Sequence, residues 1–192
     1  MPILGIVASQ ITGHLSTNSY ESIATVTVGA GGQSSISFSS IPSTYKHLQI
    51  RALIQEARPT YWIGDAYMTI NGATSGYSYH ALFGDGATVS VGASASTTQI
   101  YMGSGGIGTS TGGTYAGAVI DVLDYANANK YKTVRGLMGF DTNGTGGGAN
   151  LGGRVTLFSG LYQATTAVSS ITIYGGNNNL TQYSSFALYG VR

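Results

Sequence analysis

The amino-acid sequence predicts an all-β fold, either a β-sandwich or a β-barrel. Apolar and β-branched residues recur in short runs with a period of two, which is the pattern of half-buried strands. Clusters of Gly, Asn and Asp separate these runs and supply turn positions. No long stretch combines a 3.6-residue period with helix caps, so helices are not expected. Many short strands joined by such turns are typical of the two architectures.

About a dozen strands are expected along the chain, each between two turn clusters. They cover residues 22–28, 34–41, 46–55, 65–70, 77–83, 87–91, 97–102, 116–125, 130–140, 153–163, 168–174 and 182–191. The glycine-rich segments 103–113 and 144–153 are predicted to be long loops. Residues 1–19 lack a clear strand pattern and are expected to form an N-terminal arm, which leaves 20–192 as a single domain.

The last predicted strand, 182–191, is apolar on both faces. Successive side chains of a strand point to opposite sides, so Phe186 and Leu188 face one way while Tyr189 and Val191 face the other. A strand with two apolar faces is expected in the interior of a sheet or beneath a neighbouring subunit.

Charge is scarce in this protein. Only 8% of the residues are charged, against about 25% in a typical soluble domain, and the net charge is +1. This balance predicts no binding to nucleic acid or to an anionic membrane. The nearest approach to a basic cluster is Lys130, Lys132 and Arg135, which we interpret as a solvated strand edge. No apolar run is long enough for a transmembrane helix.

Several short motifs resemble catalytic or metal-binding patterns but lack the structural context that the chemistry requires. Gly103–Gly108 matches a dinucleotide fingerprint, and 108–112 matches a nucleophile elbow, yet neither is followed by a predicted helix. Asp121 and Asp124 are three residues apart on a strand and point to opposite faces, so they cannot flank one bond. A calcium site in the loop after Asp141 stays open, although the Glu of an EF-hand is missing.

No cofactor, metal or catalytic residue is therefore assigned. The chain has no cysteine, which excludes disulfides, zinc–thiolate sites and Cys nucleophiles. The three histidines are widely spaced and fit no metal pattern. These observations predict a protein without enzymatic activity.

Aromatic residues are the most informative candidates for binding. The 14 tyrosines and one tryptophan suit interfaces and sugar contacts, because they bury area with few rotatable bonds and keep a polar group. Tyr61 and Trp62 lie where a loop meets a predicted strand. They are interpreted either as core residues or as a ligand or subunit contact.

Three stretches of the sequence resemble virion structural proteins of tailed bacteriophages. They are YESIATVTVGAGGQSSISFSSIPSTYKHLQIR at 20–51, IDVLDYANANKYKTVRGLMG at 120–139 and SGLYQATTAVSSITIYGGNNNLTQYSSFALYGVR at 159–192. The opening MPILGIVAS is similar to the short N-terminal segment of such proteins. The resemblance implies a jelly-roll-like antiparallel β-sandwich, a homotrimer, a place on the virion among other phage proteins, and no enzymatic activity.

The N-terminal arm is the expected attachment to the virion. Its apolar side chains could dock in a groove of a partner or add to a sheet of one. The residues concerned are Ile3, Leu4, Ile6 and Val7. The N-terminus lacks the basic region and the long apolar run of a signal peptide, so we expect synthesis in the host cytoplasm and assembly into the virion.

Two positions on the particle and one other class of function remain open at the level of sequence. The favoured position is a tail-fibre or tail-tip knob that touches a host surface glycan through the loops 57–64, 103–115 and 142–153. The second is a head-decoration protein that clamps capsomers. The third hypothesis is a secreted carbohydrate-binding module, against which the missing signal peptide argues.

Overall fold

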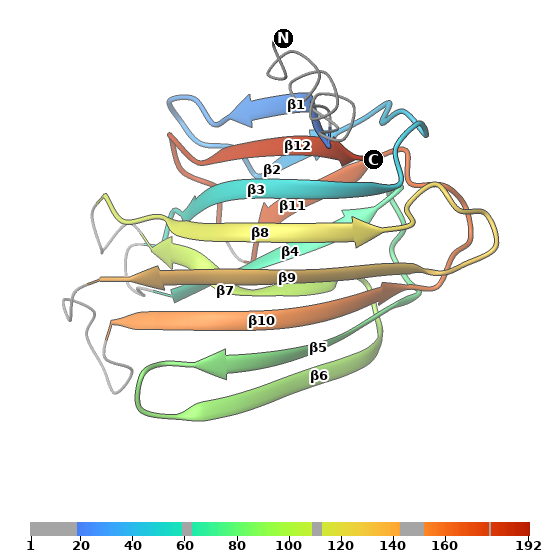
Figure 1. Ribbon diagram of the computed structural model, residues 1–192. Coiled ribbons are helices and arrows are strands. Elements are labelled where there is room, and N and C mark those ends of the chain that lie inside the picture. Colours follow the sequence, from blue (N-terminus) through green and yellow to red (C-terminus); the bar gives the residue numbers. More distant parts are fainter. Residues whose placement is uncertain (1–18, 59–62, 109–112, 143–151, 177) are drawn as a thin grey trace, which may run out of the picture.

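The computed structural model describes residues 19–58, 63–108, 113–142, 152–176 and 178–192, and these form strands without any helix (Figure 1). The strands are β1 (Tyr20–Thr27), β2 (Ser35–Phe38), β3 (His47–Glu56), β4 (Ile63–Ile70), β5 (Tyr77–Gly84), β6 (Val89–Thr97), β7 (Ile100–Gly108), β8 (Ala116–Leu123), β9 (Lys132–Asp141), β10 (Gly153–Tyr162), β11 (Ile171–Gly175) and β12 (Ser185–Val191). The predicted all-β fold is confirmed.

Two antiparallel sheets pack face to face as a β-sandwich, with the larger sheet in front in Figure 1. The large sheet has the strand order β1-β12-β3-β8-β9-β10-β5-β6, and the small sheet has the order β2-β11-β4-β7. A short parallel pairing joins them, in which Gln55 and Glu56 of β3 lie opposite Ile107 and Gly108 of β7. Every other strand pair is antiparallel.

Eight of the strands pair in a nested order. β1 pairs with β12, β2 with β11, β3 with β8, and β4 with β7. The remaining strands are two inserted sets, β5–β6 between β4 and β7, and β9–β10 between β8 and β11. These four strands extend the large sheet beyond β8, so the large sheet is twice as wide as the small one.

The core lies between the two sheets and follows from the alternation along the strands. Inward positions of the large sheet, such as Ile50, Phe186 and Leu188, are fully buried, and so are Met68 and Ile173 of the small sheet. Burying one such side chain stabilises the fold by about 1.5–3 kcal/mol. The prediction that the C-terminal strand is interior is confirmed, because β12 lies between β1 and β3.

Two glycines make room for large core side chains. A Cβ on Gly136 would lie 2.6 Å from the ring of Phe158, and one on Gly160 would lie 2.5 Å from Ile100. No real side chain tolerates such distances to well-packed neighbours, so these positions of β9 and β10 require glycine.

One predicted loop is instead a strand. Gly103–Gly108 was expected to begin a long loop, but it continues β7, while β6 extends to Thr97. The ladder of β4 supplies backbone partners to this glycine-rich segment, which outweighs its weak strand propensity. Gly103 has a φ of +126°, and Thr156 occupies the space where its side chain would be, 2.8 Å from the Cβ position.

The three loops predicted as a contact surface leave the sandwich at the same end. They follow β3, β7 and β9, which run in the same direction, since β3 is parallel to β7 and is separated from β9 by one antiparallel strand. The ends of these strands lie on the left of Figure 1. Residues 59–62, 109–112 and 143–151 within the loops lie outside the described residues.

We predict that Leu188→Ala lowers the free energy of unfolding by about 2–5 kcal/mol, because it opens a cavity beneath a strand that is paired on both sides. The matched control is Leu123→Ala, which removes the same atoms from a partly exposed, outward position at the end of β8 and is expected to cost less than about 1 kcal/mol. Urea denaturation of both variants measures the difference. Equal losses would contradict the interior position of β12.

Candidate functional site

The residues that the sequence nominated for binding lie outside the part of the chain that the structure describes. This holds for Ile3, Leu4, Ile6 and Val7 of the predicted arm and for Tyr61 and Trp62. Their roles therefore stay predictions. The strand that follows Trp62 is β4, and its outward side chains take part in the arrangement described next.

A row of three tyrosines crosses the outer face of the small sheet. Tyr174 of β11 lies opposite Tyr67 of β4, and Tyr67 lies opposite Tyr101 of β7. Alternation along the strands places their neighbours Met68 and Ile173 in the core, so the tyrosines point outward. Directly opposite residues have adjacent side chains, which explains why the rings meet.

Two further rings from the large sheet complete a tyrosine cluster, which we define as Tyr67, Tyr79, Phe83, Tyr101 and Tyr174. Tyr101 is at its centre, with ring centroids 5.6 Å from Tyr67, 5.4 Å from Tyr79 and 5.9 Å from Phe83. Tyr174 stacks on Tyr67 at 6.0 Å. Tyr101 is buried, whereas the other four rings are half-buried. These spacings are those of favourable aromatic pairs.

Polar groups border the rings. The hydroxyl of Tyr101 donates to the Asp65 carboxylate at 3.2 Å, and the hydroxyl of Tyr174 donates to the Gln99 side-chain oxygen at 2.5 Å. Burial, and to a smaller degree the Asp65 carboxylate, raises the pKa of Tyr67 to about 12. Burial also raises the pKa of Tyr174. Both hydroxyls therefore remain protonated, and able to donate, at neutral and mildly alkaline pH.

This arrangement can bind a ligand that has both apolar and hydroxylated surfaces. Half-buried ring faces offer flat apolar area, and the neighbouring carboxylate, amide and hydroxyl groups offer acceptors and donors. The rings hold one another in place, so little side-chain freedom is lost when a ligand binds. A sugar ring has the matching chemistry.

Sequence reasoning nominated tyrosine as a residue type but missed these particular residues. Alternation in Ile63–Ile70 already placed Asp65 and Tyr67 on one face of a strand. What it could not indicate is that β11 and β7 are the neighbours of β4, because those pairings join residues far apart in the chain. The cluster exists only through that strand order.

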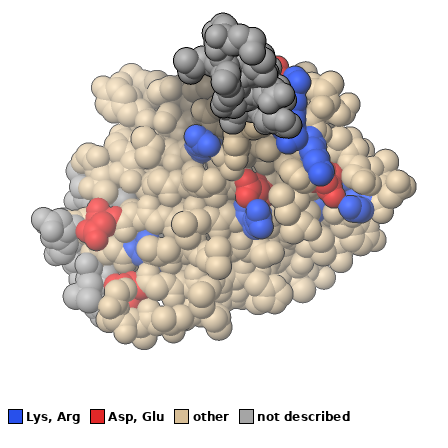
Figure 2. Space-filling view, viewed as in Figure 1, with Lys and Arg blue, Asp and Glu red and all other residues tan. Residues whose placement is uncertain are grey.

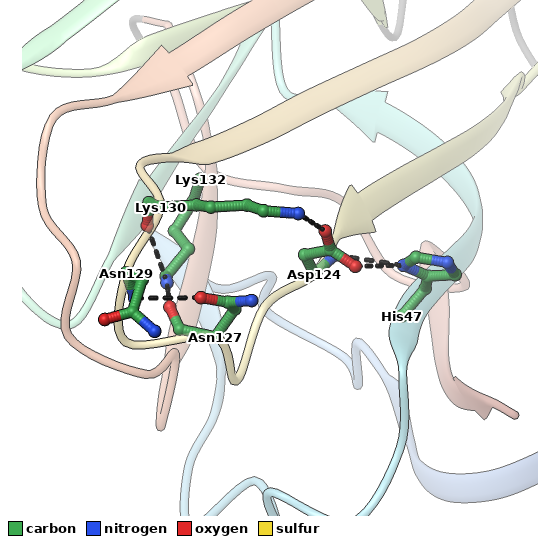
Figure 3. A network of polar contacts seen from close by, with 6 residues as sticks. All are labelled: His47, Asp124, Asn127, Asn129, Lys130 and Lys132. Carbon is green, nitrogen blue, oxygen red and sulfur yellow. Dashed lines mark hydrogen bonds and ion pairs between the residues drawn. The ribbon is translucent and has the colours of Figure 1, made fainter.

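The interpretation of Lys130, Lys132 and Arg135 as a solvated edge is wrong for Lys132. Its side chain is fully buried, and its ammonium donates to the backbone carbonyls of Asn127 and Lys130 (Figure 3). A third backbone carbonyl, that of Thr165, accepts from the same ammonium. Burial lowers the pKa of Lys132, and the Asp124 carboxylate partly offsets this effect. Lys132 is the first residue of β9 and points inward. Its hydrogen bonds connect the turn after β8 with the segment after β10.

The other two basic residues pair individually with the two aspartates of β8 and its turn. Lys130 contacts Asp124 at 2.8 Å and holds the pKa of that carboxyl below its usual range, and the Asp124 backbone N–H donates to His47 (Figure 3). Arg135 contacts Asp121 at 3.3 Å. The two carboxylates thus have separate partners, and Asp124 lies in the turn after β8, where its φ is +48°, and not on the strand as expected.

Of the remaining motifs, only Gly103–Gly108 lies within the described ranges, because residues 109–112 of the nucleophile-elbow motif and 143–151 of the loop after Asp141 lie outside them. Gly103–Gly108 forms a strand, and none of these ranges contains a helix that could receive a phosphate at its N-terminus. No group of three or more His, Asp or Glu side chains among the described residues could hold a metal ion. Within the same ranges, no helix is apolar and long enough to cross a membrane.

Comparisons with protein-family models, with curated proteins and with solved structures found no match. The resemblance to tailed-phage virion proteins therefore stays a prediction from the sequence.

We predict that Lys132→Met lowers the free energy of unfolding by about 1–3 kcal/mol, because buried carbonyls lose their shared donor. Lys130→Met is the control, since it removes an ammonium from an exposed ion pair and is expected to cost less than about 1 kcal/mol. Chemical denaturation of the two variants side by side provides the comparison. If both variants lose the same free energy of unfolding, the hydrogen bonds of the buried ammonium do not stabilise the fold.

Proposed function

We propose that this protein is a non-enzymatic structural protein of a tailed-phage particle that contacts host surface glycans. In this proposal it is displayed in several copies as a tail-fibre or tail-tip knob. The resemblance of 20–51, 120–139 and 159–192 to phage virion proteins supports the location. The low charge supports the dense packing of copies, because neighbouring molecules repel one another little.

The tyrosine cluster is the observation that carries the glycan contact. The three rings of its tyrosine row are held at fixed spacing on the outer face of the small sheet, beside the acceptors Asp65 and Gln99. One such contact binds weakly. Copies that are held together on one particle raise the effective concentration of the second contact, so avidity can exceed the single affinity by orders of magnitude.

The nested strand pairing supports the jelly-roll part of the expectation. A jelly roll is a long hairpin rolled into two sheets, so its first strand pairs with its last and its second with its second last. The pairs β1–β12, β2–β11, β3–β8 and β4–β7 follow this order. We therefore interpret β5–β6 and β9–β10 as insertions that widen one sheet of a jelly roll.

A head-decoration protein is the second candidate. The same low charge, 8% of residues, suits a molecule that packs against capsomers in a lattice. Imaging of the intact particle distinguishes the two positions. Antibody label at the tail tip with tens of copies supports a knob, and label over the capsid with hundreds of copies supports decoration.

For the glycan contact, we predict that Tyr67→Ala weakens binding to an array of bacterial surface polysaccharides by about tenfold or more. The expected loss arises because the ring forms the middle of the tyrosine row. Binding by the unchanged protein is expected to stay constant between about pH 7 and pH 9, since the raised pKa values of Tyr67 and Tyr174 keep these two hydroxyls protonated.

The control for this measurement is Tyr131→Ala, which removes a tyrosine that is 54% exposed and lies outside the cluster. It should leave polysaccharide binding unchanged. An array on which the unchanged protein binds nothing, or on which both variants lose binding equally, would refute the glycan contact. Turnover of a polysaccharide on the array would refute the non-enzymatic proposal.

A further inference from the structure

Large aliphatic side chains cover the outer face of the large sheet. Eight of them are between 44% and 80% exposed, and all lie at outward positions of six consecutive strands, from β3 to β6 in the sheet order. We call this set the aliphatic face: Leu53, Leu82, Val89, Val91, Val119, Leu137, Val155 and Leu157. Monomeric proteins rarely expose contiguous apolar patches larger than a few hundred square ångströms.

Strand register arranges these side chains in two rows. One row is continuous, with each residue opposite the next across five strands: Val119, Leu137, Leu157, Leu82 and Val91. The other row combines three large side chains with three glycines, in the order Leu53, Gly117, Gly139, Val155, Gly84 and Val89. Directly opposite side chains touch, so the first row is a continuous apolar ridge.

Hollows lie beside the ridge. Two glycines of the second row, Gly117 and Gly139, floor a hollow of about 530 Å³ between Leu53 and Val155. A second hollow of about 600 Å³ lies on the other side of the ridge, lined by Leu82, Val91 and Leu157 together with more polar neighbours. The face therefore has a projecting row of side chains with a hollow on each side of it, and the two hollows have similar volumes.

Charge on this face is sparse and balanced. The charged residues at outward positions of these six strands are Arg51, Asp121, Arg135 and Asp141, two of each sign. Asp121 and Arg135 also neutralise each other as an ion pair. Figure 2 shows the broad uncharged surface that results. An identical surface can approach it without net repulsion.

The size of the face matches what a stable interface needs. Strands lie about 4.8 Å apart and rise about 3.4 Å per residue, so eight strands of seven to ten residues present on the order of 1,000 Å². A standard protein interface takes about 800 Å² from each partner. The aliphatic face, together with the outward residues around it on the large sheet, can supply that area.

We propose that the aliphatic face is the surface on which a second copy of this chain packs. The ridge of one copy would enter the hollows of the other, with the two sheets about 10 Å apart as in a sandwich core. The other large hydrophobic side chains exposed among the described residues are three tyrosines, Tyr20, Tyr131 and Tyr183. They form no second aliphatic patch, so the face best matches itself, as an interface on a two-fold symmetry axis requires.

This inference rests on the proposed function, in which several copies are displayed together, and it names the surface through which they pack. Its test is independent of glycan binding. The molar mass of the full-length protein at about 50 μM, measured by light scattering after size exclusion, should correspond to two or more chains. The double variant Val119→Lys/Leu157→Lys places two ammonium groups on the ridge. It should raise the dissociation constant about 100-fold or more and elute as a monomer.

The matched control is Ser37→Lys/Thr69→Lys. It adds the same charge at outward positions of β2 and β4, which are likewise separated by one strand, on the opposite face of the sandwich. It should keep the mass of the unchanged protein. Circular dichroism checks that both variants keep their sheets, and Leu157→Gln replaces the double variant if that one fails to fold.

Two results would overturn the inference. One is a full-length protein that stays a single chain at this concentration. The other is an oligomer that survives the ridge variants, which would place the contact elsewhere, for example at the edge strand β6 or in residues 1–18. A monomer that still binds polysaccharide would overturn this inference and leave the proposed glycan contact standing.

Discussion

Strand β3 is the element on which the rest of the structure depends, because it is the only described strand that pairs within both sheets. Its two edges carry β12 and β8, and its last residues also pair with β7. Its inward side chains Leu48, Ile50 and Ile54 are fully buried in the core, while Leu53 on the other side begins the aliphatic face. Loss of this strand would remove the ladder between β3 and β7 that joins the two sheets, together with the side chains that β3 adds to the core.

The two outer faces of the sandwich differ in chemistry, and the difference follows from the width of the sheets. The small sheet covers the inner side of the large one, and its own outer side carries hydroxyls and the tyrosine row. The inserted strands make the large sheet wider, so its outer side offers enough area for a partner of the same size. A molecule with one face for copies of itself and another for a hydroxylated ligand suits multivalent binding.

Much of the fold was predictable because strand formation depends on local alternation and on turn residues. Apolar side chains on both faces of 182–191 indicated an interior strand, and β12 is one. Two predictions were wrong, because contacts with other segments outweighed the conformation or exposure that the local sequence favours. Gly103–Gly108 is a strand because β4 lies beside it, and Lys132 is buried because three carbonyls surround its ammonium. Strand β4 and Thr165 are far from these residues in the sequence, and no alternation pattern indicated that the nearby carbonyls of Asn127 and Lys130 turn toward the Lys132 ammonium.

The sequence by itself determined the fold class, the approximate positions of the strands, the scarcity of charge and the wealth of tyrosine. Tertiary structure alone decided which strands are neighbours, and thereby which side chains act together. Tyr67, Tyr101 and Tyr174 form one row because β11, β4 and β7, which are not consecutive in the chain, lie side by side. Val119, Leu137 and Leu157 form another row through the register of the consecutive strands β8, β9 and β10. The physical reason is that alternation specifies the face of a side chain along its own strand, whereas its lateral neighbours depend on long-range pairing.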